Sequence, residues 1–422
     1  MSNENVAYQA DSLLVQAAKV KQASKAMALA STAQKNEALL QSADLLVGNS
    51  ELILAANASD VENAKESGTS ATVIDRLLLN SSRIMSMAKG LRDVALLGDP
   101  VGEVSEGWVR PNGLQIEKVR VPLGVVGIIY ENRPNVTSDA AALCIKSGNS
   151  AFLRGSSAAI NSNLRIAELL SSGLEKAGLP RDAVTLVTDT ARESAVEFMR
   201  LRGYIDCLIP RGGPSLISAI VENATVPYVI DGDGNCHIYV DQSADLGQAV
   251  EIIKNAKVQR PSVCNAVETV LVHENIAAAL LPRLRDSMPS VEFRVDVRSH
   301  TFMPEAKIAA ESDYQVEFLD LILAIKIVNS LDEAIDHIGK YGSGHSEAIL
   351  TNDYQAAKRF IAEVDAAAVL VNASTRFVDG GEVGYGAEIG ISTQKLHARG
   401  PMGLKELTTQ KFVIQGTGQV RV

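Results

Sequence analysis

Cys264 is the residue best suited by type and setting to do chemistry, because it lies in a polar loop, QRPSVCN, at residues 259–265. A cysteine is a nucleophile only as its thiolate, which a neighbouring cation or the amino terminus of a helix favours. Arg260 could supply the cation, and a helix or strand rich in Ala and Val follows the loop. From these residues alone, a catalytic role and a packing role for Cys264 both stay open.

The remaining cysteines lie in different surroundings: Cys144, Cys207 and Cys236. We interpret the first two, in AALCIK and YIDCLIP, as small core residues. With no CxxC pair and no histidine cluster at ligand spacing, the pattern indicates reduced thiols, with neither a disulfide framework nor a metal site.

A second candidate is the segment IYENRP at residues 129–134, which ends a predicted buried strand and precedes a helix. Ligands of open α/β sheets bind at the carboxyl ends of strands. The Asn132 amide could donate to an oxyanion there, and Arg133 could pair with a carboxylate or phosphate. The alternative is that Asn132 only caps the helix that Pro134 opens.

Two further turns could hold phosphate, although the dinucleotide fingerprint GxGxxG is absent. Gly212 and Gly213 follow the strand YIDCLIP and open a helix, so their amides could bind an anion. Arg154 with Ser156 and Ser157 follows the strand SAFL in the same way. Each turn is also explained by an ordinary helix start.

The elements that must position these residues follow a clear order. Helical spacing of apolar residues runs from about Ala7 to Leu97, and a hairpin is predicted around Pro111-Asn112-Gly113. From Val121 onward, short β-branched runs alternate with amphipathic stretches, which predicts a parallel sheet covered on both faces. We expect a domain boundary near Val258. The Gly-rich stretch at 372–403 fits an active-site loop, and KFVIQG fits a last strand.

Composition excludes several classes of function. The 422 residues are 46% hydrophobic and 21% charged, as in an ordinary globular enzyme of two to three domains. The net charge of −10 argues against a nucleic-acid partner. No apolar run approaches the ~18 residues of a membrane span, and no targeting segment is seen, so the expectation is a soluble, cytoplasmic protein.

Three long segments resemble the aldehyde dehydrogenase superfamily, and within it the gamma-glutamyl phosphate reductases, also called glutamate-5-semialdehyde dehydrogenases. They are VPLGVVGIIYENRPNVTSDAAALCIKSGNSAFLRGSSAA, VQRPSVCNAVETVLVH and VNSLDEAIDHIGKYGSGHSEAI. The resemblance implies an α/β fold with a Rossmann-type cofactor domain, an α/β catalytic domain and a small β oligomerisation hairpin. The corresponding ranges are 1–105 and 123–257, then 258–385, then 106–122 with the tail 405–422, and a returning loop at 386–404.

The resemblance also implies roles for single residues. Cys264 falls on the thiol nucleophile, and Asn132 on the amide that forms the oxyanion hole with the backbone N–H of the cysteine. Arg154 takes the place of a cofactor-binding lysine. Ser157 replaces a glutamate that grips the ribose hydroxyls in NAD-preferring members, which favours NADP(H). Further implied cofactor contacts are Ser156, Gly212, Gly213 and Glu317, and Arg133 and Arg376 are our candidates for gripping the anionic groups of the substrate.

One departure from the superfamily supports the reductase. The usual general-base glutamate, in a Glu-Leu-Gly-Gly run, has no counterpart in VIDGDG at 229–234, although Asp231 or Asp233 could serve. An aldehyde oxidiser needs that base to activate water against its thioester, whereas a reductase of an acyl phosphate does not.

The function expected from the resemblance is NADPH-dependent reduction of L-glutamyl 5-phosphate to L-glutamate 5-semialdehyde and phosphate through a cysteine thioester, in proline biosynthesis. An NADP-linked aldehyde oxidiser and a non-catalytic binding protein are the alternatives. The hairpin and tail would pair between subunits of a homo-oligomer, a dimer or tetramer, with Trp108 as an interface residue. An association with glutamate 5-kinase, the preceding enzyme of the pathway, is left open.

Overall fold

The structure is a computed structural model that describes residues 11–421, and it divides into two compact units. Unit 1 comprises the described parts of 1–230, 386–389 and 402–422, and unit 2 comprises 231–385 and 390–401. The first ten residues, where the predicted helical opening begins, and Val422 lie outside the described residues. Each unit has its own parallel sheet and its own hydrophobic core.

The boundary predicted near Val258 is wrong, because unit 2 already begins at Asp231. Strand β7 (Cys236–Val240) pairs with β8 (Val267–His273) on one side and β12 (Ser346–Leu350) on the other, inside the sheet of unit 2. Strand and helix alternate through this region without a change in composition, so the sequence marks no boundary here. The predicted returning loop at 386–404 is also divided, since 390–401 belongs to unit 2.

Unit 1 opens with the predicted helices. They are α1 (Leu13–Met27), α2 (Thr32–Gly48), α3 (Ser50–Glu66), α4 (Ala71–Leu77) and α5 (Ser81–Leu96). Ser31 starts α2 with a capping box, since its side chain accepts from the Gln34 N–H and the Gln34 side chain accepts from the Ser31 N–H. The Asn80 side chain caps α5 by accepting from the Arg83 N–H.

A four-stranded parallel sheet in the order β5-β4-β3-β6 forms the centre of unit 1. Its strands are β3 (Val125–Tyr130), β4 (Ser150–Arg154), β5 (Val184–Leu186) and β6 (Cys207–Arg211). The connecting helices are α6 (Asn135–Lys146), η1 (Ser157–Ala159), α7 (Ile160–Lys176), η2 (Arg181–Ala183), α8 (Arg192–Phe198) and α9 (Pro214–Asn223). Ile129 pairs with Arg154 and Tyr130 with Arg211, so the loops that follow β3, β4 and β6 leave from one edge of the sheet.

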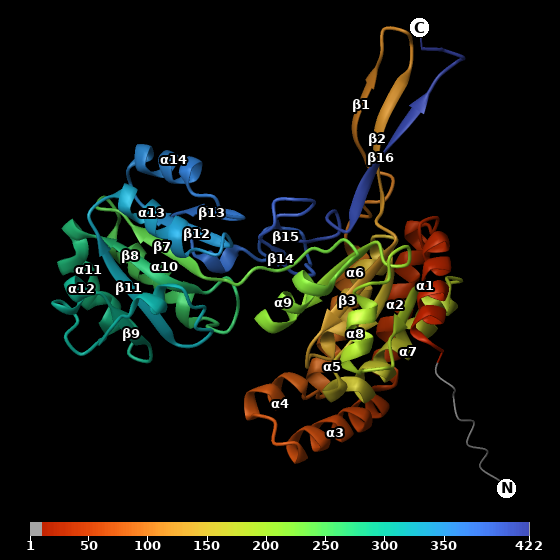
Figure 1. Ribbon diagram of the computed structural model, residues 1–422, viewed down its shortest axis with the longest axis horizontal. Helices are drawn as coiled ribbons and strands as arrows, with labels where there is room; N and C mark the ends of the chain where they lie inside the picture. Colours follow the sequence, from red (N-terminus) through yellow and green to blue (C-terminus); the bar gives the residue numbers. More distant parts are fainter. Residues whose placement is uncertain (1–10, 422) are drawn as a thin grey trace. The chain divides into compact units, whose positions relative to one another are not determined.

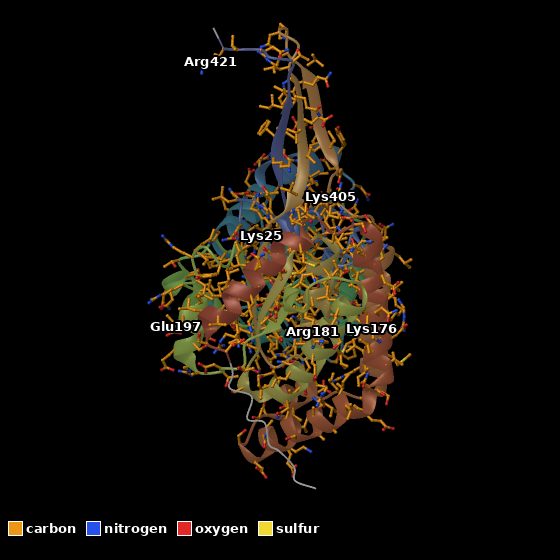
Figure 2. All side chains as sticks on the ribbon, turned by 90° about the vertical axis from the view of Figure 1, so that its right-hand side faces the viewer. Lys25, Lys176, Arg181, Glu197, Lys405 and Arg421 are labelled. Atoms are coloured by element: carbon orange, nitrogen blue, oxygen red, sulfur yellow. The ribbon has the colours of Figure 1, made fainter. Side chains whose placement is uncertain are left out.

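A three-stranded antiparallel ribbon extends from the body of unit 1 (Figures 1 and 2). It contains the predicted hairpin, β1 (Val104–Val109) and β2 (Gln115–Pro122), and the predicted last strand, β16 (Thr408–Gln415), which pairs with β2 of the same chain. Figure 2 shows Lys405 at the base of the ribbon and Arg421 near its far end. Trp108 is 38% exposed and packs edge-on against Phe412.

Unit 2 contains a seven-stranded, fully parallel sheet in the order β10-β9-β11-β8-β7-β12-β13. Its remaining strands are β9 (Glu292–Val295), β10 (Lys307–Ile308), β11 (Ile322–Val328) and β13 (Ala368–Val371). Its helices are α10 (Leu246–Val258), α11 (Glu274–Ser287), α12 (Val297–His300), η3 (Glu311–Tyr314), α13 (Leu331–Tyr341), α14 (Tyr354–Glu363) and η4 (Thr375–Phe377), and β14 (Ile391–Ser392) pairs with β15 (Gly400–Pro401).

Successive side chains of the β-strands in unit 2 enter two different cores. Val270 and Val272 of β8 pack with apolar residues of α10 and α11, whereas Leu271 packs with residues of α13 and α14. Helices therefore cover both faces, which explains why the strands read as continuous apolar runs and confirms the predicted parallel sheet. Within residues 11–421, no helix combines the length and the apolar character needed to cross a membrane.

Candidate active site

The Cys264 loop joins the end of α10 to the start of β8, and Cys264 itself is half-buried. Of the two elements that the sequence left open after the loop, the structure has the strand, so no helix amino terminus favours the thiolate here. Any electrostatic support must come from side chains instead. Cys144 and Cys207 are buried in unit 1, as predicted.

Gly234 and Cys236 hold the backbone of Cys264 in place. A Cβ atom on Gly234 would overlap the backbone of Cys264, so the two segments approach more closely than any other residue type allows. The Cys236 thiol donates to the Cys264 carbonyl oxygen over 3.2 Å. Burial raises the pKa of Cys236 well above its usual value, so this cysteine stays a neutral donor while Cys264 remains accessible.

Arg376 is the predicted substrate residue that the structure places beside the Cys264 loop. Its guanidinium donates through Nη1 to Asn265 and through Nε to the Gln259 Oε1 atom at 2.7 Å. Asn265 in turn donates to the Val378 carbonyl oxygen at 2.9 Å. Arg376 is close enough to interact electrostatically with Cys264, so a guanidinium, rather than a helix terminus, is a source of positive potential there.

Glu317, the predicted cofactor residue of unit 2, is linked to the same loop. Its carboxylate accepts a hydrogen bond from the backbone N–H of Gly234, the residue that contacts Cys264. Burial raises the pKa of Glu317, while that hydrogen bond and the Lys257 charge oppose the shift. Three predicted residues, Cys264, Arg376 and Glu317, thus belong to one connected network.

In unit 1, Asn132 does not cap a helix. The N-cap of α6 is Pro134, with no side-chain cap, so the alternative that Asn132 only caps this helix is wrong. The Ser156 hydroxyl donates to the Asn132 Oδ1 atom at 2.8 Å, which directs the amide NH₂ group away from Ser156. The side chain is therefore held as a hydrogen-bond donor, as an oxyanion site requires.

Arg154 and the serines after it form the turn beyond β4. Arg154 is 8% exposed as a whole residue, and its guanidinium donates to the carbonyl oxygens of Thr190 and Ala191, at 3.1 and 2.6 Å. Its buried Nε atom has no hydrogen-bond partner, while Ser157 is exposed. The Arg154 cation, with one hydrogen-bond donor still available, and the exposed Ser157 hydroxyl together fit an anionic group of a nucleotide.

The Gly212–Gly213 turn beyond β6 fits a phosphate less directly. The backbone N–H of Gly213 donates to the Glu131 carboxylate at 3.4 Å, and a Cβ on Gly212 would meet that same carboxyl group. An anion at these amides must displace Glu131. Arg133, the other predicted substrate residue, is exposed in the same loop as Glu131.

Sequence reasoning missed two buried charged residues that flank the Cys264 loop. Lys257 is the next-to-last residue of α10 and Glu268 lies in β8, and their Nζ and Oε2 atoms are 2.7 Å apart with both side chains fully buried. The sequence feature that could have revealed this pair is a charge inside each of two otherwise apolar stretches, AKV and VETVLV. Charged side chains within buried segments are usually paired with an opposite charge.

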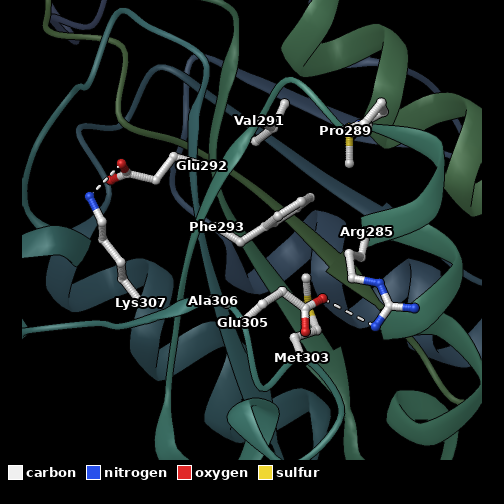
Figure 3. Close-up of a pocket in the computed structure, with 10 residues that line it drawn as sticks. Arg285, Pro289, Val291, Glu292, Phe293, Met303, Glu305, Ala306 and Lys307 are labelled. Atoms are coloured by element: carbon white, nitrogen blue, oxygen red, sulfur yellow. Dashed lines mark hydrogen bonds and ion pairs between the residues drawn. The ribbon is translucent and has the colours of Figure 1, made fainter.

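Two surface cavities of unit 2 contain none of the predicted site residues. One, of about 240 Å³, lies among α11, β9 and β10, with ion pairs from Arg285 to Glu305 and from Lys307 to Glu292 (Figure 3). The other, of about 480 Å³, lies at the carboxyl ends of α13 and α14. Among the described residues, no group of three His, Cys, Asp or Glu side chains could hold a metal ion.

The chain matches the family model "Aldehyde dehydrogenase family" over residues 6–310, and it belongs to that family. Within the family, the curated proteins that it resembles include gamma-glutamyl phosphate reductases. The protein from Carboxydothermus hydrogenoformans is 59% identical over 97% of this chain and 100% of the relative, and that from Caldanaerobacter subterraneus is 56% identical over 96% and 99%. The sequence resemblance is confirmed.

Solved structures agree. The gamma-glutamyl phosphate reductase of Thermotoga maritima has a TM-score of 0.96 and 51% identity, covering 98% of this chain and 100% of its own. The predicted aldehyde dehydrogenase-like α/β fold is confirmed. Membership also implies an oxidoreductase that uses a nicotinamide cofactor.

Proposed function

We propose that this protein reduces L-glutamyl 5-phosphate to L-glutamate 5-semialdehyde and phosphate through a thioester on Cys264, using NADPH, as a step of proline biosynthesis. The observation that carries the proposal is the close contact of Gly234 with Cys264, inside the run that replaces the water-activating glutamate. At Gly234 no side chain fits, and Asp233 beside it is exposed. Position 234 therefore offers no general base against a thioester at Cys264, which supports its survival until it is reduced.

The proposed reaction assigns each bond change to a residue of this chain. The Cys264 thiolate attacks the acyl carbon, forming a C–S bond, and the C–O bond to phosphate breaks. The Asn132 amide, fixed by Ser156, donates to the oxygen of the tetrahedral intermediate. When bound, the reduced nicotinamide supplies a hydride to the thioester carbon. Cys264 then leaves as the thiolate when the C–S bond breaks, releasing the aldehyde.

Two cations are proposed to hold the anionic groups. Arg376 lies beside Cys264 through Asn265, which suits the phosphate or the α-carboxylate of the substrate, and Arg133 is the second candidate. For the cofactor, we propose contacts by Arg154, Ser156, Ser157, Gly212, Gly213 and Glu317. With serine at position 157 no carboxylate repels a ribose 2′-phosphate, which favours NADP(H) over NAD(H).

The reverse reaction tests this function. With glutamate 5-semialdehyde and NADP⁺, we expect nicotinamide reduction, followed by absorbance, to require inorganic phosphate, because phosphate must resolve the thioester. Omitting phosphate should leave no steady-state rate. Equal rates with and without phosphate would mean that water resolves the thioester, and the aldehyde-oxidiser alternative would replace the reductase.

We further propose a cytoplasmic homo-oligomer, a dimer or tetramer, assembled through the ribbon and its tail. Besides Trp108, the strands of the ribbon expose four large apolar residues: Val104 (50%), Val109 (67%), Phe412 (59%) and Ile414 (59%). An exposed apolar patch of this kind is typical of a protein–protein interface. Light scattering should give a mass of at least two chains, and replacing Trp108 and Phe412 by serine should lower it. A wild-type monomer would contradict the proposal. An association with glutamate 5-kinase would be tested in the same experiment by adding the kinase.

A further inference from the structure

The buried Lys257–Glu268 pair connects the two ends of the Cys264 loop. Lys257 is the next-to-last residue of α10, and Glu268 is the second residue of β8. The pair therefore closes the loop at its base, and both side chains are fully buried. Burial raises the pKa of Glu268 to about 7 and lowers that of Lys257, so this burial opposes both charges. Apolar residues would fill the same space without that cost.

The same carboxylate also contacts the segment of Glu317. Its second oxygen, Oε1, accepts from the backbone N–H of Leu319 at 3.4 Å. Leu319 has a φ of +54°, in the left-handed region that a leucine rarely adopts, so surrounding contacts must hold it there. Between Glu317 and Leu319, the ring of Phe318 lies 6.0 Å from the Lys257 ammonium and 5.0 Å from the Arg294 guanidinium.

These contacts form a closed circuit around the proposed reaction centre. Glu317 accepts from Gly234, and Gly234 packs on the backbone of Cys264. From Cys264 the loop leads to Glu268, which contacts Leu319, two residues from Glu317. The spacing between the nucleophile and Glu317 is therefore fixed on one side by Gly234 and on the other by Glu268 with Lys257.

We infer that Lys257 and Glu268 are positioning residues, which hold the Cys264 loop and the Glu317 segment at a fixed separation so that thioester and hydride donor are aligned. This inference rests on the proposed function, in which Cys264 carries the acyl group and Glu317 contacts the nicotinamide ribose. Neither residue touches the reacting atoms. Their loss should therefore impair hydride transfer more than it impairs folding.

The test removes both charges together, in Lys257→Met/Glu268→Leu, so that no unpaired ion is left buried. We expect kcat to fall by about 10- to 100-fold while the melting temperature stays close to that of the wild type. The deuterium isotope effect on kcat with deuterated NADPH should rise, because a misaligned hydride transfer becomes rate-limiting. Lys257→Met/Glu268→Gln, which also leaves no unpaired cation but keeps an acceptor for the Leu319 N–H, should lose less activity.

The matched control is the Lys35–Asp99 pair of unit 1, whose side chains are 1% and 9% exposed and whose Nζ and Oδ2 atoms are 2.6 Å apart. Lys35→Met/Asp99→Asn should keep kcat and the isotope effect of the wild type. The inference is overturned if the Lys257/Glu268 variant keeps kcat within about twofold, or if its loss follows the loss of folded protein with an unchanged isotope effect. Full activity of Cys264→Ala would instead overturn the proposed function.

Discussion

Cys264→Ala is expected to lower kcat by about 10⁴-fold or more, because without the thiol no thioester can form and the two-step route is lost. The substitution removes one sulfur from a half-buried position, and the contacts of the Cys264 backbone with Gly234 and Cys236 use atoms that alanine retains. The fold should therefore be preserved. Steady-state rates in both directions measure the effect.

The control for this prediction is Cys207→Ala, a buried thiol in strand β6 of unit 1. We expect it to keep the wild-type kcat. NADPH binding by Cys264→Ala, followed through the fluorescence of the nicotinamide, should be unchanged. Iodoacetamide should label Cys264 selectively in the wild type, and substrate should protect it. Turnover by Cys264→Ala at a wild-type rate would remove Cys264 from the mechanism.

Asn132→Ala is expected to lower kcat by about 10²- to 10³-fold, the usual loss when one donor of an oxyanion site is removed. The reason is specific to this chain, because Ser156 holds the Asn132 oxygen at 2.8 Å and thereby turns the NH₂ group outward as a donor. KM for the acyl phosphate should change little, since the donor acts on charge that develops only in the transition state.

Asn135→Ala is the matched control for Asn132. Asn135 is also an asparagine near the end of β3, but its amide donates to the Asp139 carboxylate at 2.9 Å on the first turn of α6. Its replacement should leave kcat within about twofold. If both variants lose activity equally, the loop conformation rather than the Asn132 donor controls the rate. A change in KM alone would assign Asn132 to substrate binding.

A large part of the fold could be predicted from the sequence. The turn at Pro111-Asn112-Gly113 predicts the hairpin of β1 and β2, and the apolar runs that include Val125–Tyr130 predict fully buried parallel strands. The domain boundary, in contrast, was not predictable: the sequence suggests Val258, whereas unit 2 begins at Asp231. Which sheet β7 joins is set by its hydrogen-bonded neighbours β8 and β12, and no local property of CHIYV records that choice.

The candidate site, like the fold, was only partly predictable from the sequence. The sequence indicates Cys264 and Asn132, because a thiol in a polar loop and an amide at a strand end are recognisable from residue type and local setting. The element after Cys264, which the sequence left open as a helix or a strand, is a strand, and a charge beside the thiol comes from Arg376, more than a hundred residues away in the chain. The sequence indicates Arg376 as a candidate cation, but it does not show that Asn265 and Cys264 are its neighbours.

The sequence by itself therefore determined the family, the parallel α/β architecture and the chemical groups available, because these depend on periodicity and on long segments of matched residues. Only the tertiary structure decided that Gly234 packs on Cys264, that Ser156 orients Asn132, and that Glu268 joins Lys257 to the Leu319 segment. Such contacts join residues that are distant in the chain or in different loops. Their geometry depends on strand order and register, and a given pattern of apolar residues is compatible with more than one strand order and register.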